Sequence, residues 1–302
     1  MKFDLHVHTT ASDGRDTPSG IIKKAYKIGL DLISITDHDT LNGLKEAGEE
    51  AKKYNILFVP GVEITIKCSF YGFDKDYEMH LLGYGFDLNN EELFNKLEEM
   101  RAYRFIRGNL ILEKLNKKLE HKGFNKISKE EFDKIQKGVE SFGRPHIAKL
   151  LIDKGIVSTN KEAFTEYLIE CDVPKKMLSL KEASSLIHNA GGIVSLAHPW
   201  CGKDMPFLKL SSDLKMHKKF LEDMIPWIDG VECYHLEHSA DMIENYVELV
   251  KSMGLIVTGG TDHHGTKLPD KLGTLNIPSL VAENFLKFMK NKDCFYQKKQ
   301  SL

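Results

Sequence analysis

The sequence predicts an α/β barrel that is interrupted by a small helical insertion domain. Strand and helix patterns alternate over residues 1–89 and again over residues 174–302. Residues 90–173 between them are helical in pattern and rich in Lys and Glu. Repeated β/α units favour a parallel sheet, and about seven of them close a barrel. We therefore expect two barrel segments, 1–89 and 174–302, around an insertion at 90–173.

Seven short runs are expected to form strands, because they are continuously apolar or alternate with period two. They cover residues 2–7, 32–36, 57–66, 79–83, 193–197, 230–234 and 255–259. Helical spacing of apolar residues separates most of them, at residues 19–28, 41–54, 180–190, 220–225, 240–252 and 281–289. In the first helix Ile21, Ile22, Ala25 and Tyr26 share one face, and Pro18 precedes them as a favoured first-turn residue.

The insertion is predicted to be helical. Residues 91–120 carry an apolar stripe at helical spacing. Ser128, with Glu131 three residues later, is typical of a helix N-terminus. Pro145 stands where another helix would begin, and residues 161–169 give a further one.

The overall composition is that of an ordinary globular enzyme. The chain has 302 residues, of which 41% are hydrophobic and 28% charged, with a formal net charge of −2. No global basic field is present, so we expect no binding to long duplex nucleic acid. Five cysteines without a CxxC pair argue against a thiolate zinc site. Without an apolar leader or membrane span, we expect a cytoplasmic protein that is a monomer or a homo-oligomer.

Residues that bind metals well recur where the predicted strands end. Strand geometry of period two turns His6 and His8 to one side, and likewise Asp262 and His264, whereas His263 points the other way. Imidazoles and carboxylates without thiolates suit Mn²⁺, Zn²⁺ or Fe²⁺ better than Ca²⁺. The candidate ligands are His6, His8, Asp13, His38, Glu63, His80, His198, Asp262 and His264.

Each short motif also has a purely structural explanation. His6 and His8 are compatible with an ordinary strand, and Asp37 or Asp39 with a cap on the following helix. Glu63 could face outward, although a carboxylate in so apolar a strand is costly without a cation or hydrogen bonds. The joint placement of the motifs at strand ends favours a metal site at the mouth of a barrel.

Together the motifs resemble the polymerase and histidinol phosphatase (PHP) superfamily of metal-dependent phosphoesterases. The matching stretches are His6-Val7-His8 with Thr9 to Gly14, Ile35-Thr36-Asp37-His38, Gly61-Val62-Glu63, His80, Ala197-His198-Pro199 and Thr261-Asp262-His263-His264-Gly265. The resemblance covers most of the chain and implies a distorted (β/α)7 barrel of the TIM-like kind. It also implies two or three divalent metal ions, with Mn²⁺ expected ahead of Fe²⁺ or Zn²⁺.

The resemblance also implies how the ligands divide among the ions. The first ion would take His6, His8, Glu63 and Asp262, the second Glu63, His80 and His198, and the third Asp13, His38 and His264. Many relatives carry His where this chain has Asp13, and a carboxylate favours harder metals. A water activated between two ions that share Glu63 would attack phosphorus. Asp37, Asp39 and His235 are the unranked candidates for the acid that protonates the leaving group.

A narrower likeness involves the insertion. Phe142-Gly143-Arg144-Pro145-His146-Ile147-Ala148 resembles the subgroup that acts on nucleoside 3′,5′-bisphosphates and short 5′-phosphorylated RNA. Gly230-Val231-Glu232, followed by Glu237-His238-Ser239, is similar to the same subgroup. Arg144 and His146 would then bind a substrate phosphate, with Arg104 or Arg107 assisting. The structural alternative is that Pro145 opens a helix and Arg144 pairs with a nearby Glu.

Other functions stay open at this point. Histidinol-phosphate phosphatase is the alternative within the same superfamily, but it needs no insertion of this kind. A non-catalytic barrel that keeps metals as a binding module is a second alternative, which all nine competent ligand positions disfavour. A zinc amidohydrolase often uses a carboxylated lysine at a strand end, and no lysine stands there.

Overall fold

The computed structural model describes residues 1–70, 76–137, 139, 142–200, 207, 210–266 and 269–294. The chain divides into two compact units. We call the first the barrel unit, which comprises Met1–Asn95 and Met177–Leu302, and the second the helical unit, which comprises Lys96–Lys176. Each is described separately below.

The barrel unit is built on one nearly closed sheet. Its strands are β1 (Phe3–Asp4), β2 (Leu32–Ile35), β3 (Leu57–Cys68), β4 (Tyr77–Tyr84), β5 (Leu178–Ser179), β6 (Ile193–Leu196), β7 (Gly230–Tyr234) and β8 (Ile256–Gly259). Seven follow the order β1-β2-β3-β4-β6-β7-β8, and β5 pairs with β3 outside this path. A parallel bridge between Val7 and His263 brings the two ends of the sheet together. The predicted (β/α)7 barrel is confirmed.

One strand runs against the predicted direction. β4 is antiparallel to both of its neighbours, β3 and β6. The link from Cys68 to Tyr77 is too short for a crossover to a parallel strand, which takes a dozen or more residues. The beginning of β4 therefore lies at the rim where β2 and β6 end. This reversal is the distortion of the barrel, and it brings His80 to that rim.

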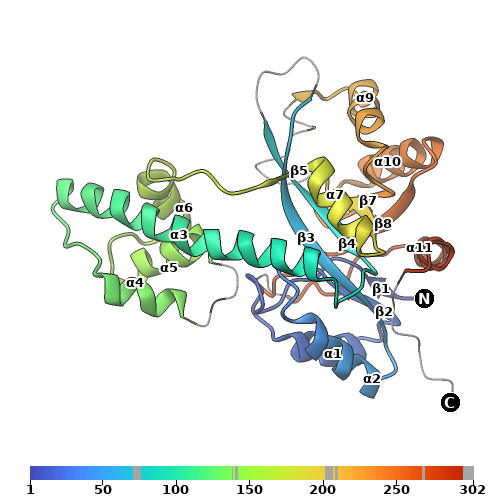
Figure 1. Ribbon diagram of the computed structural model, residues 1–302, viewed down its shortest axis with the longest axis horizontal. Helices are drawn as coiled ribbons and strands as arrows, with labels where there is room; N and C mark the ends of the chain where they lie inside the picture. Colours follow the sequence, from blue (N-terminus) through green and yellow to red (C-terminus); the bar gives the residue numbers. More distant parts are fainter. Residues whose placement is uncertain are drawn as a thin grey trace. The chain divides into compact units, whose positions relative to one another are not determined.

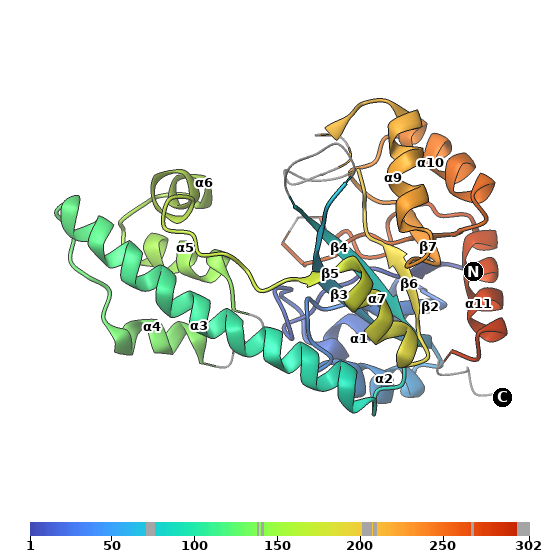
Figure 2. The same cartoon turned by 45° about the horizontal axis from the view of Figure 1, so that its top comes forward.

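Helices surround the sheet of the barrel unit, as Figure 1 and Figure 2 show. They include α1 (Pro18–Lys27), α2 (Leu44–Lys53), α7 (Leu180–Asn189), α9 (Leu214–Met224), α10 (Ala240–Ser252) and α11 (Ser279–Asn291). Ile21, Ile22 and Ala25 of the predicted apolar face of α1 are buried, but Tyr26 is 55% exposed, so its assignment to that face was wrong. The Thr17 hydroxyl caps the first turn of α1 by accepting from Gly20 N. α9 begins earlier than the predicted 220–225, because Asp213 caps it. None of the helices in the described ranges combines the length and apolar character needed to cross a bilayer.

The helical unit has its own hydrophobic core. It contains most of α3 (Glu91–His121), together with α4 (Lys129–Gln136), α5 (Arg144–Asp153), α6 (Asn160–Ala163) and the π-helical turn η1 (Phe164–Leu168). Ser128 and Glu131 form the expected capping box at the start of α4. Phe132, Phe142 and Leu151 are among the buried side chains around which these helices pack.

Candidate metal centre

The structure brings all nine predicted ligands to one rim of the barrel. His6, His8, Glu63 and Asp262 each offer a ligand atom within 4.8 Å of the others. Four further groups among the described residues meet the same criterion. Two consist of predicted ligands alone, namely His8, Asp13, His38 and His264, and His38, Glu63 and His80; the other two are His6, His198 and Glu232, and Asp16, His263 and Asp270. His198 joins through Glu63, whose Oε1 lies 3.0 Å from His198 Nε2. Segments that lie far apart in the sequence thus converge on one small volume.

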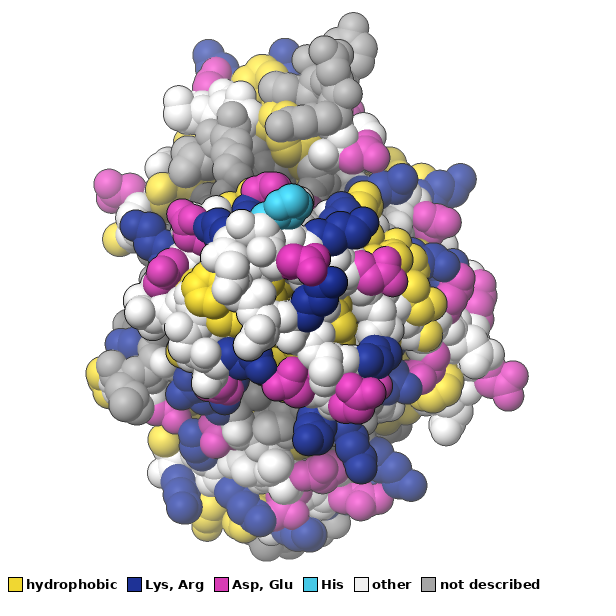
Figure 3. All heavy atoms as spheres, turned by 90° about the vertical axis from the view of Figure 1, so that its left-hand side faces the viewer, with side chains coloured by type: hydrophobic (Ala, Val, Ile, Leu, Met, Phe, Trp, Pro, Cys, Tyr) yellow, Lys and Arg dark blue, Asp and Glu magenta, His cyan; other side chains and the backbone are white. Residues whose placement is uncertain are grey.

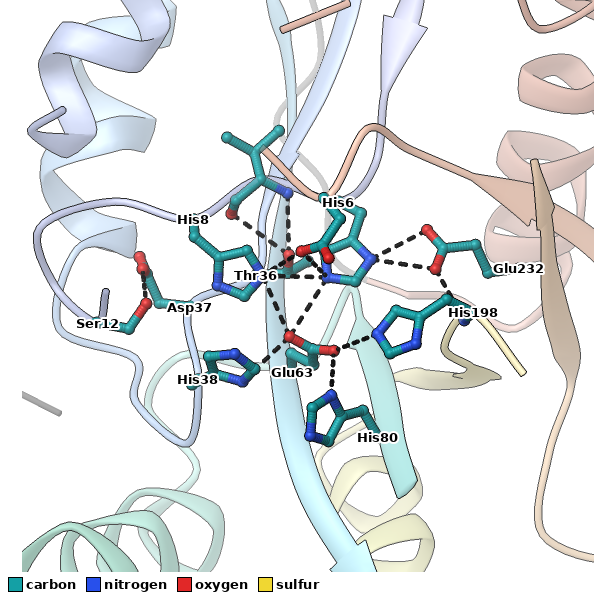
Figure 4. A network of polar contacts seen from close by, with 12 residues as sticks. His6, His8, Ser12, Thr36, Asp37, His38, Glu63, His80, His198 and Glu232 are labelled. Carbon is teal, nitrogen blue, oxygen red and sulfur yellow. Dashed lines mark hydrogen bonds and ion pairs between the residues drawn. The ribbon is translucent and has the colours of Figure 1, made fainter. Parts of the chain in front are cut away.

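Glu63 is the centre of this cluster, as Figure 4 shows. Its Oε2 lies 3.1 Å from His8 Nε2 and 3.1 Å from His38 Nδ1. Its Oε1 lies 2.8 Å from His80 Nδ1 on the opposite side. One carboxylate therefore faces imidazoles from β4 and from the ends of β1, β2 and β6.

The cluster has a buried floor and an open side. The side chains of His6, His8 and Glu63 are at most 1% exposed. Asp13 and Asp262 are 34% and 28% exposed. Deep ligands would hold an ion in a fixed position, and the exposed ones leave an approach from solvent.

The polar atoms of the cluster fit a cation better than they fit one another. His8 Nδ1, His38 Nδ1, His80 Nδ1 and Glu63 Oε2 are buried without a hydrogen bond within the described part of the chain. Buried polar atoms are rarely left in this state unless an ion or water serves them. Ligands held about 2.1 Å from one ion lie about 3.0–3.4 Å apart, which is the spacing found around Glu63. The donor set and its geometry therefore suit divalent metal ions.

The electrostatics of the cluster indicate the same need for positive charge. Burial disfavours the charged form of Glu63, but His38, His80 and His6 outweigh it and hold its pKa well below the usual value. Burial also opposes the charge on His8, yet Asp262 and Glu63 raise the pKa of His8 to about 10. Burial likewise opposes the charge on His80, but Glu63 raises the pKa of His80 to about 10. Protons on His8 and His80 therefore balance the carboxylates when no metal ion does so, whereas burial lowers the pKa of His38 to about 4 and keeps that ring neutral.

Two of the candidate ligands have backbone conformations that cost energy. Asp262 has a φ of 49° and His198 a φ of 24°, both in the left-handed region. Such conformations persist only where surrounding contacts enforce them, and they concentrate at functional sites. Here the conformation belongs to residues that follow β8 and β6 and turn their side chains toward the cluster.

Buried aspartates hold the segments that carry the ligands. Asp37 accepts hydrogen bonds from Thr9 N, Thr9 Oγ1 and Ser12 Oγ, at 2.7, 2.7 and 2.5 Å. It thereby orders the turn that ends in Asp13. Asp39 accepts from Thr65 N at 2.8 Å, beside Glu63 on β3. Both carboxylates are at most 2% exposed, so the structure places these two acid candidates among structural hydrogen bonds.

A third aspartate, Asp4 on β1, binds the segment that follows β8. It accepts from Thr261 N at 2.9 Å, from Thr261 Oγ1 at 2.6 Å and from Gly273 N at 3.0 Å. These bonds hold the segment that carries Asp262. Asp4 was not among the predicted site residues.

His235, the third acid candidate, lies directly beside the cluster. Its Nε2 is 3.6 Å from Asp262 Oδ2. Its Nδ1 accepts a hydrogen bond from Glu237 N at 3.2 Å. Because Nδ1 is the acceptor, the proton of the neutral ring is on Nε2, on the side of Asp262.

Arg144 and His146 belong to the helical unit. The purely structural explanation, a helix that opens at Pro145 and an ion pair of Arg144 with a Glu, holds in part. Pro145 stands in the first turn of α5. Arg144 Nη1 donates to Asp172 Oδ2 at 2.7 Å, so its partner is an aspartate and not a glutamate. Arg107 pairs with the other oxygen of Asp172 and is 4% exposed. His146 Nδ1 accepts from Gly143 N at 3.2 Å.

Glu232 belongs to a stretch that resembles the subgroup, but it was not predicted to be a site residue. It lies on β7 with no exposed surface, and its Oε1 is 3.0 Å from His6 Nδ1. A carboxylate in the apolar run Gly230–Tyr234 is the same signal that singled out Glu63. His263 is oriented as expected, since its ring faces Asp16 and Asp270 and not the cluster.

A small cavity adjoins the open side of the cluster. Its volume is about 100 Å³, and Asp262, His264 and Lys271 contribute to its lining. A larger cavity of about 810 Å³ lies among Lys2, Lys24, Gly273 and Asn276 and contains none of the nine candidate ligands. The smaller cavity is the one next to the candidate metal centre, because Asp262 and His264 belong to both.

Comparison with known proteins supplies the family. The model of the PHP domain matches residues 4–171. The chain belongs to the PHP family. The PHP match covers the first barrel segment and nearly all of the helical unit. With this membership, the predicted metal-dependent phosphoesterase is confirmed.

Individual PHP relatives cover almost the whole chain. A 5′-3′ exoribonuclease of Haemophilus influenzae is 29% identical over 87% of this chain and 90% of its own. A 3′,5′-nucleoside bisphosphate phosphatase of Chromobacterium violaceum is 28% identical over 87% of each chain. A solved structure from Bifidobacterium adolescentis, described as a metal-dependent phosphoesterase, has a TM-score of 0.74 at 28% identity, covering 94% of this chain and 95% of that one.

Proposed function

We propose that the chain hydrolyses phosphate esters of nucleotides, with nucleoside 3′,5′-bisphosphates or short 5′-phosphorylated oligonucleotides as substrates. The convergence of imidazoles on Glu63 carries this proposal. Separations of 2.8–3.1 Å on both of its oxygens suit a carboxylate that serves two ion positions at once. Paired ions of this kind are used for hydrolysis of phosphate esters.

The ligand sets are proposed as follows. The first ion position has His6, His8, Glu63 and Asp262, the second Glu63, His80 and His198, and the third Asp13, His38 and His264. Two or three divalent ions fit these sets, with Mn²⁺ preferred over Fe²⁺ or Zn²⁺ because carboxylate oxygens are mixed with imidazoles. When bound, such ions would acidify a water molecule and offset the charge on phosphoryl oxygens.

We assign delivery of the proton for the leaving group to His235. In its imidazolium form His235 would transfer the proton on Nε2 and be left as the neutral ring. Nε2 is on the side of Asp262, where a substrate would reach the open part of the cluster. Asp37 and Asp39 are better suited to positioning, because each carboxylate already accepts hydrogen bonds from a threonine N–H and hydroxyl. Their role is to keep Asp13 and Glu63 in place.

The helical unit supplies the basis for substrate choice. Among the described residues, Arg107 and Arg144 are both paired with the one carboxylate of Asp172, which gives two positive charges to one negative charge in this group. Arg144 is the more accessible of the two, at 25% exposure. Its planar fork can grip a second phosphate of the substrate, and His146 can add a donor. The names of the Haemophilus and Chromobacterium relatives support this substrate class.

A small substrate also agrees with the surface charges. Several lysines of the helical unit are paired with carboxylates, as in Lys118–Glu170, Lys122–Glu166, Lys129–Asp133, Lys149–Asp153 and Lys154–Glu131. The face drawn in Figure 3 likewise has basic and acidic side chains interleaved. Binding to long duplexes needs unbalanced positive charge along the phosphate backbone. We therefore propose nucleotides or short oligonucleotides as partners.

Phosphate release by the purified, Mn²⁺-loaded protein tests the proposal. Adenosine 3′,5′-bisphosphate and a short 5′-phosphorylated RNA should be turned over faster than histidinol phosphate. Preference for histidinol phosphate would favour the alternative within the superfamily. A protein that binds metal but releases phosphate from none of the three would instead be a binding module. A His8→Ala variant should lose the activity, because His8 faces both Glu63 and Asp262.

A further inference from the structure

Glu232 contacts two candidate ligands at once, although it lies outside the three proposed ligand sets. Its Oε1 and Oε2 are 3.0 and 3.1 Å from His6 Nδ1. Its Oε2 also accepts a hydrogen bond from His198 N at 2.9 Å. Figure 4 shows the carboxylate on the far side of His6 from Glu63. The two acceptors of Glu232 are therefore occupied by donors from His6 and His198.

The contact with His6 determines which ring nitrogen faces the cluster. Nδ1 must carry the proton to donate to Glu232, so Nε2 is the nitrogen whose lone pair can bind an ion. Nε2 is indeed the atom on the inner side, 3.3 Å from Glu63 Oε2 and 3.4 Å from Asp262 Oδ1. A carboxylate behind a metal-binding imidazole fixes its tautomer and orientation and raises its basicity.

The contact with His198 acts on the backbone. His198 has a φ of 24°, which a residue with a side chain adopts only under constraint. The hydrogen bond from its N–H to Glu232 supplies one such constraint. The turn after β6 then directs His198 Nε2 toward Glu63 Oε1, at 3.0 Å.

We propose that Glu232 is a positioning residue that aligns His6 and His198, and so couples the first and second ion positions. The inference deepens the proposed function and rests on its metal centre. We place Glu232 behind the ligands, because both of its oxygens already accept hydrogen bonds, from the ring N–H of His6 and the main-chain N–H of His198. Ligation by Glu232 itself is the alternative, since it lies within 4.8 Å of ligand atoms of His6 and His198, and it would require His6 to give up the Nδ1–H contact. Glu232 thus orients one ligand of the first ion position, His6, and one ligand of the second, His198, and these two positions share Glu63.

A glutamine at this position separates the two contacts. Its single carbonyl oxygen can accept from His6 or from His198, but its amide group would place a donor against the other N–H. Glu232→Gln should therefore bind Zn²⁺ alone about 10- to 100-fold more weakly than the wild type. Glu232→Asp keeps both acceptors and the charge, and should recover part of that loss. Glu50→Gln is the matched control, since Glu50 is a mostly buried carboxylate on α2 that pairs with Lys53.

Calorimetric Zn²⁺ titration of the three variants is combined with ¹⁵N NMR of the histidine rings. The Zn²⁺-loaded wild type should show His6 protonated at Nδ1 and ligated at Nε2, with His6→Gln used to assign the signal. Wild-type-like affinity in folded Glu232→Gln, within about threefold, would overturn the inference. So would ligation of His6 through Nδ1, which is decisive even if Glu232→Gln fails to fold. If the wild type and Glu50→Gln bind no Zn²⁺ either, the metal centre itself is wrong.

Discussion

Glu63 and His80 face each other across antiparallel strands, with Glu63 Oε1 2.8 Å from His80 Nδ1. The register of β3 and β4, in which Thr65 pairs with His80, produces this contact. On its other side Glu63 Oε2 meets His38 Nδ1, which follows the parallel strand β2. The reversal of β4 thus allows one carboxylate to lie between two sets of imidazoles.

Replacing Glu63 by glutamine removes its charge, keeps the volume of the side chain and should disable the metal centre. We expect Glu63→Gln to lower kcat/KM by at least about 100-fold, because the effect should exceed that of residues behind the ligands. Metal content should fall as well, which elemental analysis of the purified variant would measure. Glu46→Gln, an exposed carboxylate on α2, is the control and should leave both values unchanged. Full metal content in Glu63→Gln would contradict the bridging role.

The metal-free protein should lose stability as the pH rises from neutral. The pKa of His8 and that of His80 are raised to about 10 from 6.5. A histidine whose pKa is raised in the folded state stabilises that state fully below pH 6.5. This contribution to the free energy of unfolding is lost as the pH rises from 6.5 toward about 10. Urea unfolding in chelator between about pH 7 and 8.5 should show the decline, at up to about 1.4 kcal/mol per pH unit for each of the two histidines.

Saturating Mn²⁺ should flatten this pH dependence, because bound ions replace the protons on the imidazoles. A His8→Gln variant should also show a smaller slope in chelator. Stability of the metal-free wild type that stays constant or increases over this range would show that His8 and His80 are not protonated in the folded state.

The assignment of the acid to His235 can be separated from a structural effect by the choice of leaving group. His235→Asn should slow release of a nucleoside alkoxide by about 100-fold. It should slow p-nitrophenyl phosphate much less, because that leaving group needs no proton. Asp39→Asn should impair both substrates alike, since Asp39 holds β3 through Thr65 N. Equal losses for both substrates in His235→Asn would remove it as the acid.

Arg144 should act on substrates with two phosphates. We expect Arg144→Lys to raise KM for adenosine 3′,5′-bisphosphate by about 10-fold or more, because an ammonium cannot make the bidentate contact. Hydrolysis of p-nitrophenyl phosphate, which has no second phosphate, should be unaffected. Steady-state kinetics with both substrates give the comparison. A parallel loss on both would indicate that Arg144 only supports the fold through Asp172.

Much of the barrel could be predicted from local patterns, because its strands are buried and its helices have one apolar face. The antiparallel direction of β4 was not predicted, because a pattern of apolar residues does not show which way a strand runs relative to its neighbours. The short link between Cys68 and Tyr77 was the available signal, and alternation of strands and helices elsewhere obscured it. The two-residue strand β5 is too short to leave a periodic pattern, so it was missed.

The candidate ligands could be found because chemistry in barrels gathers at strand ends. Residues that act behind them were harder to find. Asp4, Asp37 and Asp39 each serve backbone N–H groups of another segment, and only the tertiary structure shows which. Glu232 could have been identified as a carboxylate in an apolar strand, but its partner His6 is 226 positions away.

Anomalous diffraction from crystals loaded with Mn²⁺ tests the central claim most directly. We predict at least two peaks that share Glu63, one within about 2.3 Å of each of its oxygens, with His6 and His8 near the first and His80 and His198 near the second. Manganese bound elsewhere, with no peak within bonding distance of Glu63, would contradict the account.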